Sequence, residues 1–175
     1  MMTGDHVAVP GVTLVLGGAR SGKSRFAEGL VTALPGPWTY IATAQAWDDE
    51  MRDRIRQHQA DRVPGWSTVE APLDLAAALV RHGQGPVLVD CLTLWLTNIM
   101  LADQDVPTAL AGLEAALAAR AGPIVLVGNE VGMGIVPENA LARRFRDHAG
   151  RLHQRLAVLA AQVFLTVAGL PLKVK

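Results

Sequence analysis

Cysteine, aromatic residues and an excess of charge of either sign are all scarce in this chain of 175 residues. A single cysteine, Cys91, excludes an internal disulfide framework and is typical of a reducing compartment. The 16 basic residues balance 16 acidic ones, which disfavours a nucleic-acid binder held mainly by net charge. No uninterrupted apolar run approaches the length of about 18 residues that a spanning helix needs, so we expect no membrane span.

The start of the chain also lacks the basic region and apolar stretch of a secretory signal. We therefore expect a cytoplasmic protein in which residues 1–10 form a short N-terminal extension. Pro10 and Gly11 predict a turn before the fold begins. Half of the residues are hydrophobic (50%), and the length suits one core, so we predict a single domain over residues 1–175.

Short β-branched runs alternate with helical patterns along the rest of the chain. Several of these runs lack polar alternation, which indicates strands that are covered on both faces. The alternation predicts an α/β fold with a mostly parallel central sheet flanked by helices. Strands are predicted at residues 12–16, 38–42, 66–69, 87–89, 124–127 and 163–167, with a short last strand at 172–175, and helices at 23–34, 48–61, 72–82, 92–101, 107–120 and about 137–161.

The clearest local motif follows the first predicted strand and opens the first predicted helix. It matches the phosphate-binding pattern G-x-x-x-x-G-K-[ST] in full. Its glycines let the backbone wrap phosphate oxygens, and its N–H groups and the helix N-terminus favour an anion. We expect Lys23 to reach the β- and γ-phosphates and the Ser24 hydroxyl to bind Mg²⁺. The predicted nucleotide-binding residues of this loop are Gly17, Gly18, Ala19, Arg20, Ser21, Gly22, Lys23 and Ser24.

A second Mg²⁺ ligand is expected at the end of a neighbouring buried strand. The apolar run at 87–89 delivers Asp90 at its carboxyl end, where open α/β sheets bind ligands. The alternative interpretation is that Asp90 caps the helix that follows, and the two roles are compatible. The next residue, Cys91, is expected to be a buried small residue rather than a nucleophile.

The helix predicted at 48–61 carries an unusual set of basic residues. Arg54, His58 and Arg62 follow i, i+4 and i+8, which places an imidazole between two guanidinium groups if the helix extends to Arg62. Adjacent cations lower the pKa of an imidazole and favour its neutral, nucleophilic form. From the spacing alone, however, a solvated histidine on a charged helix is the favoured interpretation and a nucleophile is the alternative.

Two more features lie at predicted strand ends. Glu70 could bind ribose hydroxyls, as acidic residues do at strand ends in other nucleotide folds, or it could be a surface residue. Residues 128–139 are rich in glycine, which is typical of a loop that approaches a ligand closely or moves, although an ordinary long connection is the alternative. After this loop, Arg143, Arg144 and Arg146 favour a solvated face over a phosphate clamp.

Taken in order along the chain, these motifs resemble one family, the bifunctional adenosylcobinamide kinase / adenosylcobinamide-phosphate guanylyltransferases of cobalamin biosynthesis. The resemblance covers residues from about 12 to 175, and its most specific part is the run 129–139. It is carried by the phosphate loop, by Tyr40-Ile41-Ala42-Thr43, by Asp49-Glu50-Met51 with Arg54-Ile55 and His58, by Asp90-Cys91-Leu92-Thr93 with Thr97-Asn98, by residues 129–139, and by Arg143, Phe145-Arg146-Asp147, Gly150-Arg151 and Gln154.

The resemblance implies a RecA-like P-loop NTPase fold and two reactions. ATP or GTP phosphorylates the aminopropanol hydroxyl of adenosylcobinamide, and GTP then donates GMP to the phosphate so formed, which gives adenosylcobinamide-GDP. It further implies that a histidine first attacks the α-phosphate of GTP, and the guanylylated histidine of the family falls on His58. The family's guanine-nucleotide positions fall on Gln59, Ala60, Asp61, Arg62, Ala42, Thr43, Ala44, Glu70 and Asp90.

The family is oligomeric, commonly a homotrimer, so the resemblance also implies a homo-oligomer. Two other functions remain as alternatives. One is a monofunctional P-loop small-molecule kinase in which His58 is structural, and the other is a nucleotide-dependent switch without transfer activity. DNA binding of the RecA type is disfavoured, because the chain has no evident basic stripe with interleaved aromatic residues.

Overall fold

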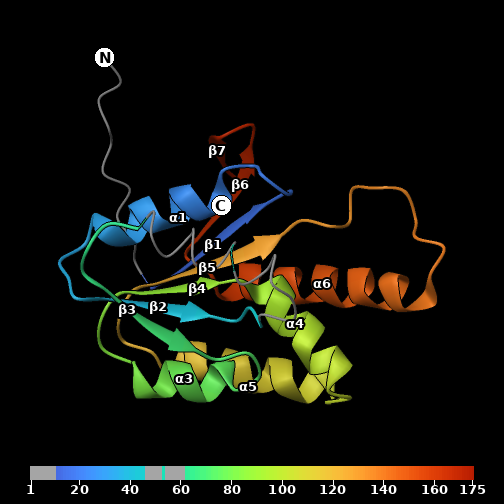
Figure 1. The fold of residues 1–175 in the computed structure, drawn as a ribbon, viewed down its shortest axis with the longest axis horizontal. Coiled ribbons are helices and arrows are strands. Elements are labelled where there is room, and N and C mark those ends of the chain that lie inside the picture. Colours follow the sequence, from blue (N-terminus) through green and yellow to red (C-terminus); the bar gives the residue numbers. More distant parts are fainter. Residues whose placement is uncertain (1–10, 46–52, 54–61) are drawn as a thin grey trace.

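The computed structural model describes residues 11–45, 53 and 62–175. Strands and helices alternate along most of this part of the chain and form a central sheet with helices on both sides (Figure 1). The strands are β1 (Val12–Gly17), β2 (Trp38–Ala42), β3 (Trp66–Glu70), β4 (Val87–Asp90), β5 (Ile124–Asn129), β6 (Gln162–Val167) and β7 (Leu170–Lys173), and the helices are α1 (Lys23–Thr32), α3 (Leu75–Arg81), α4 (Leu92–Leu101), α5 (Val106–Ala118) and α6 (Ala140–Leu159).

The sheet has the strand order β3-β2-β4-β5-β1-β6-β7. Every neighbouring pair is parallel except β6 with β7, which is antiparallel. The predicted mostly parallel sheet flanked by helices is therefore confirmed. Since β4, β5 and β1 are adjacent and parallel, their carboxyl ends meet at one edge of the sheet, which lies on the right in Figure 1.

Two apolar cores lie on opposite faces of the sheet, because neighbouring residues of a strand point to opposite sides. Leu14 of β1 packs into the core that α3, α4, α5 and α6 cover. The next residue, Val15, packs into the core under α1. Figure 1 shows α1 on one side of the sheet and α6 on the other. Burial on both faces explains why the central strands read as continuous apolar runs.

Capping side chains set two helix starts that differ from the predicted ones. The last long helix begins at Ala140, not at 137, because Asn139 Oδ1 accepts a hydrogen bond from the backbone N of Ala142 at 3.1 Å. In the same way Asp105 Oδ2 accepts from Thr108 N at 2.9 Å, so α5 begins at Val106. The helix predicted at 92–101 has the predicted bounds, and the one predicted at 48–61 lies almost wholly outside the described residues.

The last strand also differs from the prediction. It spans Leu170–Lys173 instead of 172–175, because Ala168 and Gly169 both have positive φ (51° and 80°) and close a two-residue turn. Val167 and Leu170, the residues on either side of this turn, are directly paired. None of the helices in the described part of the chain is long and apolar enough to cross a membrane.

At the opposite edge of the sheet, Arg120 joins three loops. Its guanidinium donates hydrogen bonds to His82 O at 2.6 Å, to Gly122 O at 3.1 Å and to Gly85 O. His82 follows α3, Gly85 precedes β4 and Gly122 precedes β5. The arginine therefore fixes the starts of two strands whose far ends carry candidate site residues.

Arg120→Met is expected to lower the free energy of unfolding by about 2–3 kcal/mol, because half-buried carbonyls lose charge-assisted hydrogen bonds. Urea unfolding monitored by circular dichroism measures the change. The matched control is Arg81→Met, since Arg81 is exposed on α3. Equal unfolding midpoints and slopes for the two variants would contradict this role of Arg120.

Candidate functional site

The phosphate loop connects β1 to α1 at the carboxyl edge of the sheet. A side chain at its first residue, Gly17, would bring a Cβ within 2.5 Å of Ser21 Oγ and 2.8 Å of Thr166 O. At the other end Gly22 has φ of 90° and precedes α1 directly. Both positions require glycine, the first because of crowding and the second because of its left-handed backbone.

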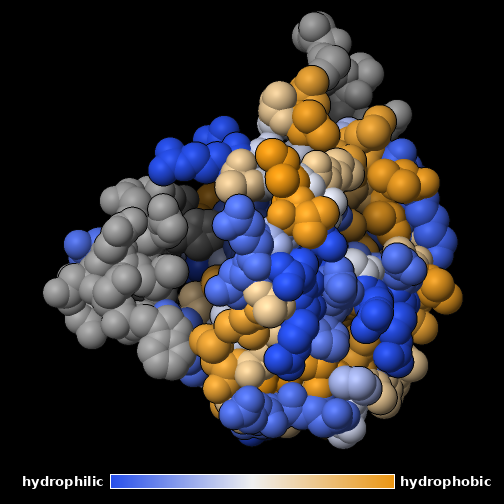
Figure 2. All heavy atoms as spheres, turned by 90° about the vertical axis from the view of Figure 1, so that its right-hand side faces the viewer, coloured by the Kyte–Doolittle hydropathy of each residue, from blue (hydrophilic) through white to orange (hydrophobic). Residues whose placement is uncertain are grey.

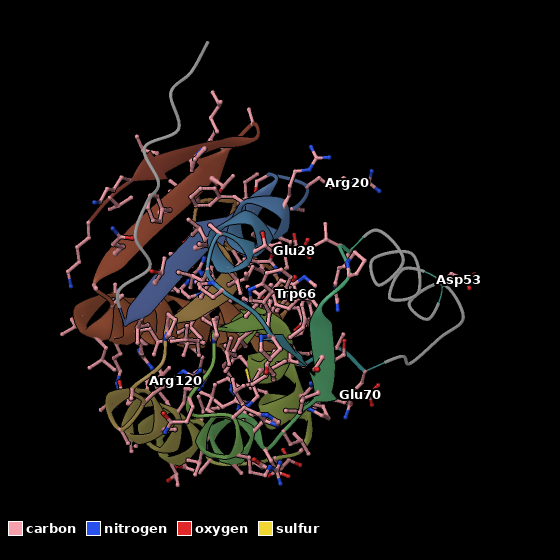
Figure 3. All side chains as sticks on the ribbon, turned by 90° about the vertical axis from the view of Figure 1, so that its left-hand side faces the viewer. Arg20, Glu28, Asp53, Trp66, Glu70 and Arg120 are labelled. Atoms are coloured by element: carbon pink, nitrogen blue, oxygen red, sulfur yellow. The ribbon has the colours of Figure 1, made fainter. Side chains whose placement is uncertain are left out.

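The rest of the loop offers donors to an anion. Gly18, Ala19 and Arg20 are exposed, and the Arg20 side chain points away from the body (Figure 3). Lys23 Nζ reaches back over the loop and donates to Gly18 O at 3.2 Å. No side chain caps the first turn of α1 within the described residues, so its backbone N–H groups face the loop. Such an arrangement favours the binding of a phosphate group.

The turn between β6 and β7 supports the loop from behind, and sequence reasoning missed this contact. Gly169 N donates to Ser21 O at 2.8 Å. A Cβ on Gly22 would lie 3.1 Å from the Cα of Gly169, so the two backbones touch. The signal in the sequence was the Ala168-Gly169 pair, which is typical of a tight hairpin turn.

Asp90 ends β4, with β5 between it and the strand that carries the loop. Tyr40 OH donates to Asp90 Oδ2 at 3.0 Å. Burial and the adjacent carboxylate raise the pKa of Tyr40, so the phenol stays protonated and acts as a donor. The alternative role of Asp90 as a helix cap is wrong: the residue that caps α4 is Cys91, whose Sγ accepts from Leu94 N at 3.5 Å.

The described residues contain no cluster of three or more His, Cys, Asp and Glu side chains that could hold a metal ion alone. A hydroxyl and a carboxylate at one sheet edge are nevertheless the donor set that P-loop enzymes use for Mg²⁺, with phosphate oxygens completing the shell. Ser24 opens α1, and Asp90 is not used as a cap. The residues present therefore fit a magnesium ion that arrives with a nucleotide.

Three predicted nucleotide residues share one row across the sheet. Glu70 of β3 pairs with Ala42 of β2, which pairs with Asp90 of β4. Neighbouring strands lie about 4.8 Å apart, so the row spans about 10 Å. Glu70 is exposed at the outer end and points outward in Figure 3.

Thr43 follows this row and is fully buried. Its Oγ1 donates to Cys91 O at 2.7 Å and accepts from Cys91 N at 2.8 Å. Asn98 Nδ2 donates to Thr43 O at 2.8 Å. The Thr43 side chain thus fixes the chain after β2 to the start of α4, and it leaves the half-buried Ala42 and Ala44 beside it at the edge.

A cluster of aromatic residues and Arg62 lies beside Asp90. The Arg62 guanidinium is 3.2 Å from the centre of the Tyr40 ring, and its Nε is 3.9 Å from Glu28 Oε1. The Trp66 and Tyr40 ring centres are 5.8 Å apart, and Figure 3 shows Trp66 of β3 near Glu28 of α1. A hollow of about 400 Å³ opens here, lined by Arg62, Val63, Pro64, Gly65, Trp66 and Thr68.

Of the predicted stretch 58–62, only Arg62 is described. His58, Gln59, Ala60 and Asp61 lie outside the described residues. The Arg62 guanidinium lies over the Tyr40 ring, and the Tyr40 hydroxyl bonds to Asp90, so these contacts link Arg62 indirectly to the end of β4.

Two residues at the carboxyl end of β5, Asn129 in the strand and Glu130 directly after it, were not among the predicted site residues. Asn129 Nδ2 donates to Thr93 Oγ1 at 2.9 Å, which ties the end of β5 to α4. Glu130 N donates to Gly17 O at 3.0 Å, and Glu130 Oε2 lies 4.0 Å from Nδ1 of the buried His153 on α6. Burial lowers the pKa of His153. The glycine-rich pattern at 128–139 marked the region but not these side chains.

Residues 131–138 form an arm that extends from the sheet edge to α6 (Figure 1). Its apolar side chains face solvent, with exposed fractions of 78% for Met133 and 97% for Ile135. Figure 2 looks onto this edge and shows hydrophobic side chains exposed among hydrophilic ones. Arg143, predicted on a solvated face, is half-buried and donates to Pro137 O at 2.9 Å, so it holds the end of the arm.

Comparison with known proteins agrees with this geometry. The family model described as cobinamide kinase / cobinamide phosphate guanyltransferase matches residues 13–174. The chain is 50% identical over 168 residues to the bifunctional adenosylcobalamin biosynthesis protein CobP of Pseudomonas aeruginosa, with 93% of this chain and 96% of that one covered. It is 42% identical over 179 residues to the corresponding protein CobU of Salmonella typhimurium, with 93% and 98% covered.

Among solved structures, an ATPase from the type III secretion system of pathogenic bacteria has a similar fold. The TM-score is 0.52 at 10% sequence identity, and the match covers 93% of this chain and 56% of the other. At that identity the likeness concerns the fold alone. Together with the strand order, it confirms the predicted RecA-like fold.

His153 generates a prediction about pH. The folded state disfavours the charged imidazole, whereas the unfolded chain protonates it near pH 6.5. The unfolded state therefore binds more protons below that pH, and stability falls as the pH falls through about 6.5 towards the lower folded pKa. His153→Gln should flatten this part of the stability profile, measured by urea unfolding between pH 7.5 and 5.

The control is His148→Gln, at a half-buried position on the same helix. The stability of this variant should change with pH as that of the wild type does. An unchanged slope in His153→Gln would show that His153 does not carry the effect.

Proposed function

The chain belongs to the cobinamide kinase / cobinamide phosphate guanyltransferase family, and we propose that it catalyses both reactions of that name. It phosphorylates adenosylcobinamide with ATP or GTP and then transfers GMP from GTP to the new phosphate, which gives adenosylcobinamide-GDP. The observation that carries the proposal is the complete phosphate loop between β1 and α1, with Asp90 at the same sheet edge.

In the kinase step the loop holds the triphosphate while the substrate hydroxyl attacks the γ-phosphorus. Lys23 and the N–H groups at the start of α1 stabilise the charge that gathers on the equatorial oxygens and the leaving group. Ser24 and Asp90 would hold Mg²⁺ when a nucleotide is bound, and the ion would supply positive charge that stabilises the transition state. Lys23 is released from Gly18 O when a phosphate oxygen takes its place.

In the transfer step His58 attacks the α-phosphorus of GTP and expels pyrophosphate. The resulting histidine–GMP phosphoramidate is attacked by the substrate phosphate, which takes the GMP and frees the imidazole. A covalent intermediate divides a transfer between two mutually repelling anions into two easier steps. The position of Arg62, at the end of the stretch that holds His58, supports this role because Arg62 lies beside Tyr40 and Asp90.

The guanine nucleotide is assigned to Gln59, Ala60, Asp61 and Arg62, to Ala42, Thr43 and Ala44, and to Glu70 and Asp90. The row of Glu70, Ala42 and Asp90 supports this assignment, since it spans a distance suited to a nucleoside. Thr43 contributes by holding Ala42 and Ala44 in place, because its side chain is bonded to Cys91 and its backbone to Asp90 and Asn98. The protein acts in the cytoplasm as a homo-oligomer, a trimer by family resemblance.

Lys23→Ala is expected to reduce the kinase rate by about 100-fold or more, because the phosphates lose the charge of the Lys23 ammonium group. The measurement is formation of adenosylcobinamide phosphate from adenosylcobinamide and ATP. Lys173→Ala, an exposed lysine of β7, is the matched control and should leave the rate unchanged. Near-normal turnover of Lys23→Ala would refute the assignment of the phosphate loop.

Incubation with GTP labelled at the α-phosphate, followed by denaturing electrophoresis, tests the transfer step. We expect a covalent label that mild acid removes, as for a phosphoramidate, and that is absent from His58→Ala but present in His148→Ala. His58→Ala should retain phosphorylation of adenosylcobinamide.

The two rival functions give different results. A monofunctional kinase forms the phosphate but takes up no label. A switch binds nucleotide and gives neither product. A label retained in His58→Ala would rule out His58 as the nucleophile.

A further inference from the structure

Glu130 lies beside the phosphate loop at the carboxyl edge of the sheet. Its strand, β5, lies between the strand of the phosphate loop and the strand of Asp90. The register pairs Gly17 with Asn129, so Glu130 is the first residue beyond the paired end of β5. Its backbone N continues the ladder by donating to Gly17 O at 3.0 Å. The carboxylate is therefore carried by a residue that is hydrogen-bonded to the phosphate loop itself.

The other described carboxylates at this edge are less suited to meet a hydroxyl near the γ-phosphate. Asp90 accepts from Tyr40 and fits the magnesium role. Glu70 is exposed on the outer strand β3, which lies two strands farther from the loop than β4, the strand of Asp90. Glu138 lies at the far end of the arm. Glu130 alone among these four is joined to the phosphate loop.

We propose that Glu130 is the general base of the kinase step, an inference that rests on the proposed function. As the substrate hydroxyl oxygen bonds to the γ-phosphorus, the bond from that phosphorus to the β–γ bridging oxygen breaks. The nucleoside diphosphate leaves with the bonding electrons. The hydroxyl proton passes to Glu130 Oε2 and from there to water. Protein kinases use a carboxylate for the same task.

The two oxygens of Glu130 have different surroundings, as this role requires. Oε1 accepts a hydrogen bond from Gly132 N at 2.5 Å, so the start of the arm fixes the orientation of the carboxylate. Oε2 has His153 Nδ1 at 4.0 Å, beyond hydrogen-bond distance, and is able to accept a proton. The Glu130 side chain is 23% exposed, which makes it partly desolvated yet open to a substrate.

His153 faces this carboxylate without forming an ion pair with it. The imidazole is buried between α6 and β5, where a Cβ on Gly128 would come within 2.8 Å of its Nε2. Burial disfavours its charged form, so it faces Glu130 as a neutral ring and forms no ion pair that would weaken the base. Other described charged groups at this edge include Arg20 and Lys23 of the loop and the carboxylates of Asp90, Glu70 and Glu138.

The decisive variant is Glu130→Gln, because an amide oxygen can still accept from Gly132 N but its side chain cannot take a proton. Its kinase kcat, with adenosylcobinamide and ATP, is expected to fall by about 100-fold or more. Its KM for ATP should change by less than about 3-fold. Transfer of GMP from GTP to adenosylcobinamide phosphate supplied ready-made should stay within about 2-fold of the wild type, because that acceptor carries no hydroxyl proton to remove.

Glu138→Gln is the matched control, since Glu138 is an exposed glutamate at the other end of the same arm, and both of its activities should equal those of the wild type. Glu130→Asp provides a second variant that keeps a carboxylate but withdraws it by about one methylene. It should retain more kinase activity than Glu130→Gln.

Undiminished kinase activity in Glu130→Gln overturns the proposal, and so does a parallel loss of both reactions, which would show a purely structural role. If Glu130→Gln fails to fold by circular dichroism, Glu130→Asp decides: a loss of the kinase step alone supports the proposal, and an equal loss of both reactions overturns it. A wild-type protein that performs neither reaction instead refutes the proposed function, and this inference falls with it.

Discussion

Parallel strand pairing is the constraint on which the candidate site depends. In an antiparallel sheet the ends of β1, β4 and β5 would alternate between two edges, whereas here they meet at one edge. Each strand then contributes one part of the candidate site: β1 the phosphate loop, β4 a carboxylate, and β5 the Asn129-Glu130 pair at its end. The helices on both faces stabilise this arrangement, because a parallel sheet needs apolar cover on each side.

A set of hydrogen bonds between side chains and backbone fixes these strand ends relative to one another. Thr43 joins the end of β2 to Cys91, Asn129 joins the end of β5 to Thr93, and Glu130 N joins β5 to Gly17. Most of the atoms involved are buried or half-buried, so leaving any of them unpaired carries a desolvation penalty. The edge is therefore a stiff frame before any nucleotide arrives, which lowers the cost of organising a site for a charged transition state.

The sequence predicted those parts of the molecule that depend on local patterns. The strand order was not predictable from it, but the strands, the phosphate loop and the place of Asp90 at the end of β4 were, because periodicity and glycine spacing are local signals. Local signals do not say which of two adjacent residues caps a helix, and here Cys91 rather than Asp90 caps α4. They also do not show contacts between distant parts of the chain, such as that of Arg62 with Tyr40 of β2. The role of Glu130 depends on register with β1, which no window of sequence contains.

The hairpin of β6 and β7 has a consequence for how such proteins can vary in length. Its two-residue turn touches Ser21 and Gly22, so the backbone that wraps phosphate is shaped partly by residues almost 150 positions away in the chain. One inserted residue in that turn would shift the register of β7 and move its side chains to the opposite face of the sheet. It would also push the turn into the phosphate loop. The arm at 131–138 has no comparable restriction at its exposed middle. Among descendants of a common ancestor, insertions should therefore accumulate in the arm and be purged from the hairpin.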